Sequence, residues 1–547
     1  MKKELYRSHL ESMESNDYRA MLIGEAWAQG DDPSELKNYT TKINKVTKED
    51  VVAVANKYYG DNYLAFYSKM GSFKGEKIEK PDYKPVVSNT NARSVFNQSL
   101  DGIGESEFAP RFIDFDKDVT MSQLKDGVKL YRCENPLNDI FSLDIRFDAG
   151  KEEIPMLEYV IPIMDMAYTE AYSKKEIKDE MSRIAASYYF EFDESYTHLH
   201  LTGIESDLER TLDLMNELLT NPQMDDKEIE TLVDYIKGDR KFENAEPYDV
   251  AQAAMEYVKY GSESDYMDRL TMKEVKALEI RSLVNEFRKL QGYSVELHYV
   301  GKRPMKDLEK VLSEHLQFGD NLKETDVPVI KPVKVYNDNE VFFVHKKNAV
   351  QSQVMFMQNG KLITLDDVPS IQAFNSYFGG GFSGLVMQEI REYRSLAYSA
   401  AAWTEIPDRM DSPSAFKGYI GTQADKTDEA ISTFMDLVRN TPDKEDRIDM
   451  IRTYLKYSVI SYQPEFRRII PYVIKKQKQG YPEVPAKFFQ DEYAAITYRD
   501  IRTYYEENVQ KTPTVVVVVG DKKKVEVDGL KKYGRLNSLK EDQLYTN

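Results

Sequence analysis

Hydrophobic and polar positions along this 547-residue chain form patterns that recur at long intervals. In one pattern, a helix ends near a glycine, an amphipathic helix then begins at a threonine with an acidic residue three positions later, and an apolar strand ends at another glycine. A threonine and an acidic side chain at this spacing are typical of a capping box, which satisfies free N–H groups of the first helical turn. The pattern occurs three times: Gly30, Thr47, Asp50 and 62–70 before Gly71; Gly261, Thr271, Glu274 and 293–300 before Gly301; Gly480, Thr497, Asp500 and 514–519 before Gly520.

Two further patterns each occur twice. A strand-like segment ends in Gly-Lys at Gly150 and again at Gly360, and another strand ends at Gly203 and at Gly421 before an amphipathic helix. Their order predicts an α+β protein of tandem homologous domains, each a mainly antiparallel sheet covered by helices. We expect one domain at residues 116–320 and a C-terminal one at 330–547. Residues 1–75 are expected to form the closing part of a truncated domain, followed by a polar, proline-bearing linker at 76–115.

Composition limits the class of protein and its partners. With 41% hydrophobic and 12% aromatic residues there is enough apolar material for several cores. No apolar run approaches the roughly 18 residues that span a bilayer, so we expect no membrane span. The polar start lacks the hydrophobic stretch of a secretory signal, yet this does not fix the compartment, and periplasm and cytoplasm both remain open. The net charge of −19 argues against nucleic acid as a partner and is compatible either with basic peptides or simply with solubility.

The segment from 378 to 403 carries the densest signal for function, F-G-G-G-F-S-G-L-V-M-Q-E-I-R-E-Y-R-S-L-A-Y-S-A-A-A-W. Glycines allow positive φ angles and the close approach of another chain. We expect Ser383 to cap a helix whose apolar side is Leu385, Val386 and Ile390, and 396–402 to form a strand. A short connection between the two would bring Arg391 and Tyr398 to one side, where both can donate hydrogen bonds to a carbonyl.

This glycine loop followed by I-R-E-Y-R-S-L-A-Y resembles the C-terminal half of the insulinase and pitrilysin family of zinc peptidases, the inverzincins. By resemblance, Arg391 and Tyr398 bind the substrate backbone and stabilise the tetrahedral intermediate. Gly379, Gly380, Gly381, Phe382 and Ser383 are the matching candidates for substrate binding. The resemblance also implies a peptide or unfolded polypeptide substrate, and two halves that close like a clamshell, of which this chain would supply one.

The family's metal motif, H-x-x-E-H, is absent from this sequence, since none of the six histidines is followed four positions later by another. His198 and His200 form the only close pair, and strand alternation predicts that both lie on one face. Two histidines fall short of the three protein ligands of a catalytic zinc site, so we expect them to line a sheet surface and expect no metal site in this chain. The single cysteine, Cys133, cannot complete a thiolate site.

The resemblance therefore predicts the C-terminal portion of a zinc-dependent metalloendopeptidase that is inactive alone. In the assembled enzyme the zinc would lie either on an N-terminal half or on a separate subunit. The sequence begins within a predicted helical hairpin, which favours an N-terminal half. This interpretation predicts exposed apolar surface around Trp27, Val51 and Val54. The alternative is a non-catalytic peptide-binding or assembly subunit of the same fold. The residues leave substrate, cleavage preference and oligomeric state open.

Overall fold

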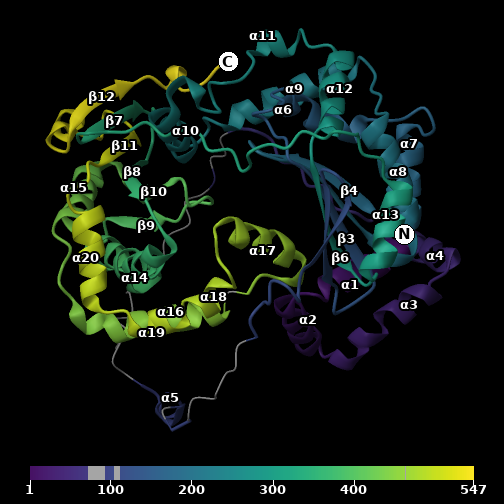
Figure 1. Cartoon of the computed structure of the whole chain (residues 1–547), viewed down its shortest axis with the longest axis horizontal. Helices are drawn as coiled ribbons and strands as arrows, with labels where there is room; N and C mark the ends of the chain where they lie inside the picture. The colour runs from purple at the N-terminus through teal and green to yellow at the C-terminus, as the bar shows by residue number, and fades with distance from the viewer. Residues whose placement is uncertain (72–74, 76–92, 101, 104–110, 462) are drawn as a thin grey trace. The chain divides into compact units, whose positions relative to one another are not determined.

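The computed structural model describes residues 1–71, 75, 93–100, 102–103, 111–461 and 463–547. These residues form two six-stranded mixed sheets with helices packed on them, which confirms the expected α+β class (Figure 1). The first sheet runs, in spatial order, β1 (Thr120–Lys125), β2 (Val128–Glu134), β6 (Val295–Gly301), β3 (Ile140–Phe147), β5 (Thr197–Ile204) and β4 (Ser187–Phe192). The second runs β12 (Arg535–Leu539), β7 (Glu340–His345), β11 (Val515–Gly520), β8 (Gln351–Leu362), β10 (Pro413–Gln423) and β9 (Ala397–Glu405).

The pairing of strands shows that the two sheets are internal repeats. Each sheet contains a parallel pair between an early strand and a strand from much later in the chain. These pairs are β2 with β6 in the first sheet and β7 with β11 in the second. The neighbours β6–β3–β5–β4 and β11–β8–β10–β9 are then antiparallel in the same order. The edges differ, because β1 is antiparallel to β2 whereas β12 is parallel to β7. The patterns around Gly150, Gly360, Gly203 and Gly421 thus correspond to equivalent strands.

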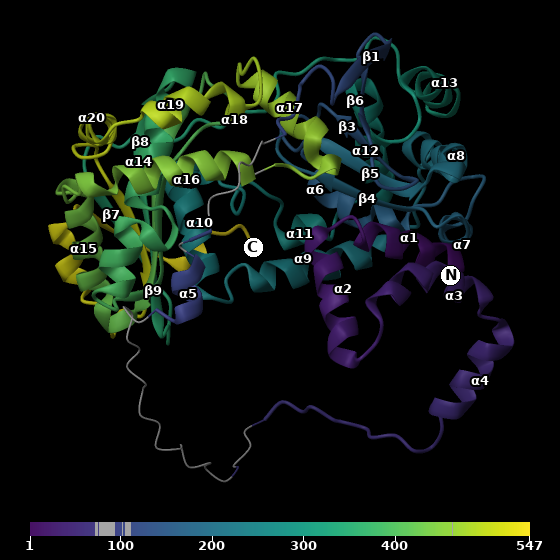
Figure 2. The same cartoon turned by 90° about the horizontal axis from the view of Figure 1, so that it is seen from below.

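Helices cover one face of each sheet. The first sheet packs against α6 (Leu157–Val160), α7 (Lys174–Ile184), α8 (Leu208–Thr220), α9 (Glu228–Phe242), α11 (Met272–Val275), α12 (Ile280–Arg288) and α13 (Met305–His315). The second packs against α14 (Val368–Phe378), α15 (Thr427–Arg439), α16 (Ile448–Ser461), α17 (Ile469–Lys478), α18 (Pro485–Phe488), α19 (Gln490–Ala495) and α20 (Tyr498–Asn508). Helix α17, which lies between β10 and β11 in sequence, also contacts β2 of the first sheet, and Figure 2 shows it on the side that faces this sheet.

The opposite faces of the two sheets differ in polarity. The valine run of β11 is buried on both sides: Val516 and Val518 face the helices above, while Val515, Val517 and Val519 pack against α10 (Pro247–Tyr260). A strand buried on both faces reads as a continuous apolar run, which explains the sequence of β11. The first sheet instead presents charged groups and histidines on its second face, at alternate positions of β3, β5 and β6.

The chain divides into two compact units, one comprising Met1, Lys3–Arg19 and Phe112–Asn547, the other Lys2 and Ala20–Arg111. Helix α1 (Lys2–Ser12) lies largely in the first unit. The second contains most of α2 (Asn16–Gln29) and all of α3 (Tyr39–Lys45), α4 (Lys48–Tyr58) and α5 (Val95–Leu100). Side chains of Trp27, Val51 and Val54 are 79%, 55% and 56% exposed, which confirms the expected exposed apolar surface.

Two expectations for the first 115 residues change. Residues 62–70 form no strand, because no neighbouring strand among the described residues pairs with their backbone. The predicted linker includes the short helix α5, and most of the remainder of 76–115 lies outside the described residues.

All three predicted capping boxes form, at Thr47 with Asp50, Thr271 with Glu274 and Thr497 with Asp500. Among the helices that the structure describes, none is both long and apolar enough to cross a membrane.

Candidate peptide-binding site

The segment after α14 folds into a tight turn, a π-helical turn and a strand. A 3₁₀ turn spans Gly381–Ser383 (η7), a π-helical turn follows at Met387–Glu392 (η8), and β9 begins at Ala397. We expected an α-helix here, but Tyr393 N–H bonds the Gln388 carbonyl five residues earlier, at 2.9 Å, which widens the turn. The expected apolar side is confirmed, since Leu385, Val386 and Ile390 are fully buried. π-Helical turns occur frequently at functional sites.

The glycines of this loop are required mainly by its internal packing. A Cβ on Gly379 would lie 1.7 Å from the Ala402 carbonyl oxygen of β9, and one on Gly380 would lie 2.6 Å from the Ser376 carbonyl oxygen of α14. Gly381 has open space around it but a φ of +56°, which disfavours other residues. Two of the three glycines therefore hold the loop against its own domain, and contact of the loop with a peptide stays a prediction.

Ser383 does not cap the following helix, contrary to the expectation. Its hydroxyl donates to the Gly380 carbonyl at 3.5 Å, and no side chain caps the N-terminus of η8. The reason is geometric, because the 3₁₀ turn at Gly381–Ser383 makes Ser383 part of the loop rather than the residue before the helix. The carbonyl of Ser383 instead accepts a hydrogen bond of 2.9 Å from Arg447 Nη1, which ties the loop to the start of α16.

Arg391 and Tyr398 lie together, as the short connection predicted. The Arg391 guanidinium carbon is 4.9 Å from the centre of the Tyr398 ring and 5.4 Å from that of Phe382. The connection closes through Ser395, whose φ of +51° is rare for a residue with a side chain. Both rings are exposed, Tyr398 by 77% and Phe382 by 73%. Cation–π contacts at exposed positions stabilise by about 0.5–1 kcal/mol, so the two rings restrict where the guanidinium points.

A groove of about 410 Å³ lies on the same sheet, over the face that α10 only partly covers. Its floor includes Met355, Met357 and Tyr419 of the central strands, together with Ala401 and Trp403 of β9. Its polar edge carries Gln252, Glu256, Lys259 and Lys417. An apolar floor with a few polar groups at the edge is typical of a ligand site, and sequence analysis did not find it because its residues come from four separate elements.

The histidine pair lies on the polar face of the first sheet. His198 and His200 of β5 stack with ring centres 5.2 Å apart, which confirms that both point to one face. Asp144 of β3 lies against them and was not found by sequence analysis, because strand pairing alone brings it to His200. Cys133 is buried, and burial raises the pKa of its thiol to about 11, which keeps it protonated.

Comparison with known proteins finds similarity to the peptidase family that the loop resembles. Residues 294–454 match the family model described as the Peptidase M16 inactive domain. A protein of Rickettsia felis described as an uncharacterized zinc protease is 20% identical over 362 residues, which are 63% of this chain and 84% of the relative.

Solved structures share the fold. The peptidase M16 inactive domain from Pseudomonas fluorescens superposes with a TM-score of 0.58 at 16% identity, over 74% of this chain and 98% of its own. The periplasmic protease PqqL from Escherichia coli gives a TM-score of 0.58 at 14% identity, over 90% of this chain but 55% of its own length. The chain therefore contains a segment that matches the M16 inactive domain and shares the fold of M16 peptidase structures, as its resemblance to the insulinase and pitrilysin family implies.

Proposed function

We propose that this chain is the substrate-binding portion of a zinc-dependent metalloendopeptidase, in which Arg391 and Tyr398 bind the peptide backbone and stabilise the tetrahedral intermediate. The observation that supports this most strongly is the partly exposed guanidinium of Arg391, which lies against the exposed rings of Tyr398 and Phe382. A cation fixed by its neighbours needs little rearrangement to meet a carbonyl oxygen that gains negative charge, which is the requirement for stabilising such an intermediate.

The two donors have complementary roles in this proposal. The guanidinium of Arg391 offers several N–H groups and a permanent positive charge, whereas Tyr398 offers one neutral O–H. Hydrogen bonds from a charged donor are about twice as strong as neutral ones, so we expect Arg391 to contribute more to binding of a backbone carbonyl, and both donors to meet the developing oxyanion. Gly381, Phe382 and Ser383 form the exposed rim of the loop and would contact the adjacent substrate residues.

The edge of the second sheet offers a way to hold an extended peptide. Strand β9 pairs with β10 on one side and is the last strand of this sheet in the described part of the chain. Extended peptides bind such edges by adding a strand, and pockets beside the edge receive alternate side chains. The groove next to Ala401 and Trp403 is placed for that purpose.

The residues of this chain do not form the family's catalytic zinc site, because H-x-x-E-H is absent from its sequence. We propose that the zinc motif belongs to an N-terminal half or a partner subunit, and that this chain binds and orients the peptide for it.

Peptide binding tests the role of Arg391 with a matched control. We expect Arg391→Ala to weaken binding of a fluorescein-labelled mixture of unstructured decapeptides about tenfold or more, measured by fluorescence anisotropy, since a hydrogen bond to a charged group contributes about 1.5–3 kcal/mol. Arg394→Ala removes an arginine three residues away that pairs with Glu389 at 3.7 Å, and should leave binding unchanged. Equal weakening by both substitutions, or by neither, would refute the assignment.

Turnover tests the role of Tyr398. In the complete enzyme, with the zinc-bearing part present, Tyr398→Phe should lower turnover about 10²- to 10³-fold while the fold stays intact, as expected for loss of an oxyanion-hole donor. Tyr393→Phe, on an exposed ring of the same loop, is the control. Unchanged turnover would remove Tyr398 from the mechanism. Binding without any turnover in the assembled protein would support the alternative, a non-catalytic peptide-binding subunit.

A further inference from the structure

The polar face of the first sheet gathers nitrogen and oxygen ligands from three adjacent strands. Asp144 pairs with His200 across β3 and β5, and with His298 across β3 and β6. His198 lies two residues before His200 on the same face of β5. The pleat therefore brings three imidazoles around one carboxylate, although the four residues span more than 150 positions of sequence.

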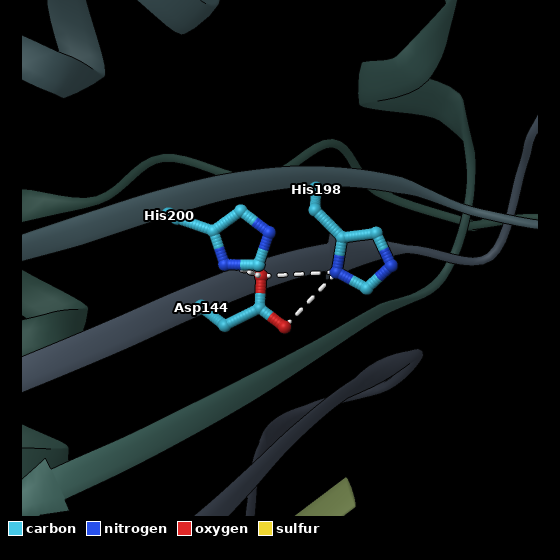
Figure 3. Close-up of side chains that lie close together, drawn as sticks. All are labelled: Asp144, His198 and His200. Carbon is cyan, nitrogen blue, oxygen red and sulfur yellow. Dashed lines mark hydrogen bonds and ion pairs between the residues drawn. The ribbon is translucent and has the colours of Figure 1, made fainter. Parts of the chain in front are cut away.

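The distances between these groups match those around a tetrahedral metal ion. Asp144 Oδ2 lies 3.0 Å from His198 Nδ1, and Asp144 Oδ1 lies 3.4 Å from His200 Nδ1 (Figure 3). Ligand atoms of Asp144, His198 and His200 all lie within 4.8 Å of one another. Nitrogen and oxygen bind Zn²⁺ at about 2.0–2.1 Å in a tetrahedron, which separates neighbouring ligand atoms by roughly 3.3 Å.

Hydrogen bonding among the protein groups leaves this cluster incompletely satisfied. One carboxylate faces three imidazoles, the third being His298, whose Nδ1 is 3.6 Å from Asp144 Oδ2. The buried Nε2 of His200 makes no hydrogen bond within the described residues, and Glu191 Oε2, 3.3 Å away, is not aligned for one. One divalent ion beside Asp144 could accept a nitrogen lone pair from each of the two stacked histidines at once.

We infer that Asp144, His198 and His200 form a binding site for a divalent transition metal ion, best suited to Zn²⁺, which is separate from the family's H-x-x-E-H site. Two imidazoles and one carboxylate are a common zinc ligand set that leaves a fourth position open. This inference revises the expectation that the chain binds no metal.

A carboxylate lies near the second ring nitrogen of one proposed ligand, His200. Metal-binding histidines usually donate their second ring N–H to a carboxylate. Glu191 Oε2 lies 3.3 Å from His200 Nε2, the ring nitrogen that faces away from Asp144, so a small movement of Glu191 would supply such a partner.

A cavity beside the ligands gives access to the open position. It has a volume of about 180 Å³ and is lined by Asp144, His200 and His298 on the sheet and by Arg467 and Arg468 opposite. Arg467 pairs with Glu14 at 2.6 Å, so Arg468 is the cation of this cavity that favours an anionic or carbonyl ligand at the fourth position.

Metal titration of the purified chain tests the inference directly. After removal of metal with EDTA, we expect one Zn²⁺ per chain by isothermal titration calorimetry, and visible absorption bands typical of tetrahedral Co²⁺ on cobalt substitution. Asp144→Asn and His200→Gln should each weaken Zn²⁺ binding at least about 100-fold, the effect seen when even an outer partner is lost. His315→Gln is the matched control, because His315 forms a histidine–aspartate pair with Asp213 at 2.6 Å outside the cluster.

A second measurement needs no variant and so does not depend on folding of the substituted proteins. Zn²⁺ should protect His198 and His200, but not His315, from modification by diethyl pyrocarbonate, as mapped by mass spectrometry. Absence of a stoichiometric Zn²⁺ site, equal binding by His200→Gln and the unsubstituted chain, or no protection at His198 and His200 would each overturn the inference. None of these measurements involves peptide, so they stand or fall independently of the proposed peptidase role.

Discussion

Replacing Gly379 with alanine tests how the glycine loop is held. The new Cβ would lie 1.7 Å from the Ala402 carbonyl oxygen, while Cβ atoms essentially never approach closer than 3.0 Å. One of the two backbones must therefore move by at least the difference, 1.3 Å. Ala402 cannot move freely, because β9 is hydrogen-bonded to β10 with Ala402 opposite Gly418. Overpacking of this severity costs about 3 kcal/mol or more.

Trp403, the residue next to Ala402, provides a local probe for this change. The chain has two tryptophans, so a Trp27→Phe background leaves Trp403 as the only one. A loss of about 3 kcal/mol should lower the melting temperature of a domain of about 200 residues by roughly 6–12 °C. The emission of Trp403 should also change below the transition, since the strand beside it must shift.

Gly381→Ala is the matched control for the same loop. It meets no atom within 4 Å and is strained only by its φ of +56°, which costs about 1–2 kcal/mol. We therefore expect a smaller fall in melting temperature and an unchanged Trp403 spectrum. The reasoning is refuted if Gly379→Ala melts like the unsubstituted protein, or if Gly381→Ala is the more damaging of the two.

Two further predictions concern stability. Burial lowers the pKa of Lys476 from 10.5 to about 8. Between these pH values Lys476 is deprotonated in the folded state but protonated in the unfolded chain. The free energy of unfolding therefore rises with pH across this window. Lys476→Met should therefore raise the free energy of unfolding at pH 7, measured by urea denaturation, by up to about 3 kcal/mol. The difference from the unsubstituted protein should be smaller at pH 9.5, and an equal difference at both pH values would contradict this. Thr497→Ala should lower stability by about 1 kcal/mol in the same assay, because Thr497 Oγ1 accepts from the Asp500 N–H in the capping box, and an unchanged midpoint would argue against that contribution.

Local patterns predicted local structure well. Each threonine with an acidic residue three positions on forms its capping box, since all the interacting groups lie within one helical turn. The meeting of Arg391 with Tyr398 was also predictable, because seven residues separate them.

Features set by distant chain segments could not be predicted in this way. Asp144 reaches His198 across 54 positions only through the register of β3 and β5, which no single-sequence pattern reveals. Residues 62–70 have the composition of a strand, yet a strand needs a paired neighbour, and composition does not supply one. The π-helical turn replaces the expected α-helix because packing of the loop against β9 fixes the ends of that segment.

The packing of α10 has a consequence for dividing this protein into parts. Val250, Ala254 and Val258 of that helix precede the second sheet in sequence by some 80 residues or more, yet they close the core on its far face. A fragment starting at residue 330 would leave the valines of β11 uncovered and prone to aggregate. Limited proteolysis or truncation should thus yield a folded fragment of the second sheet that does not aggregate only when residues 247–260 remain with it.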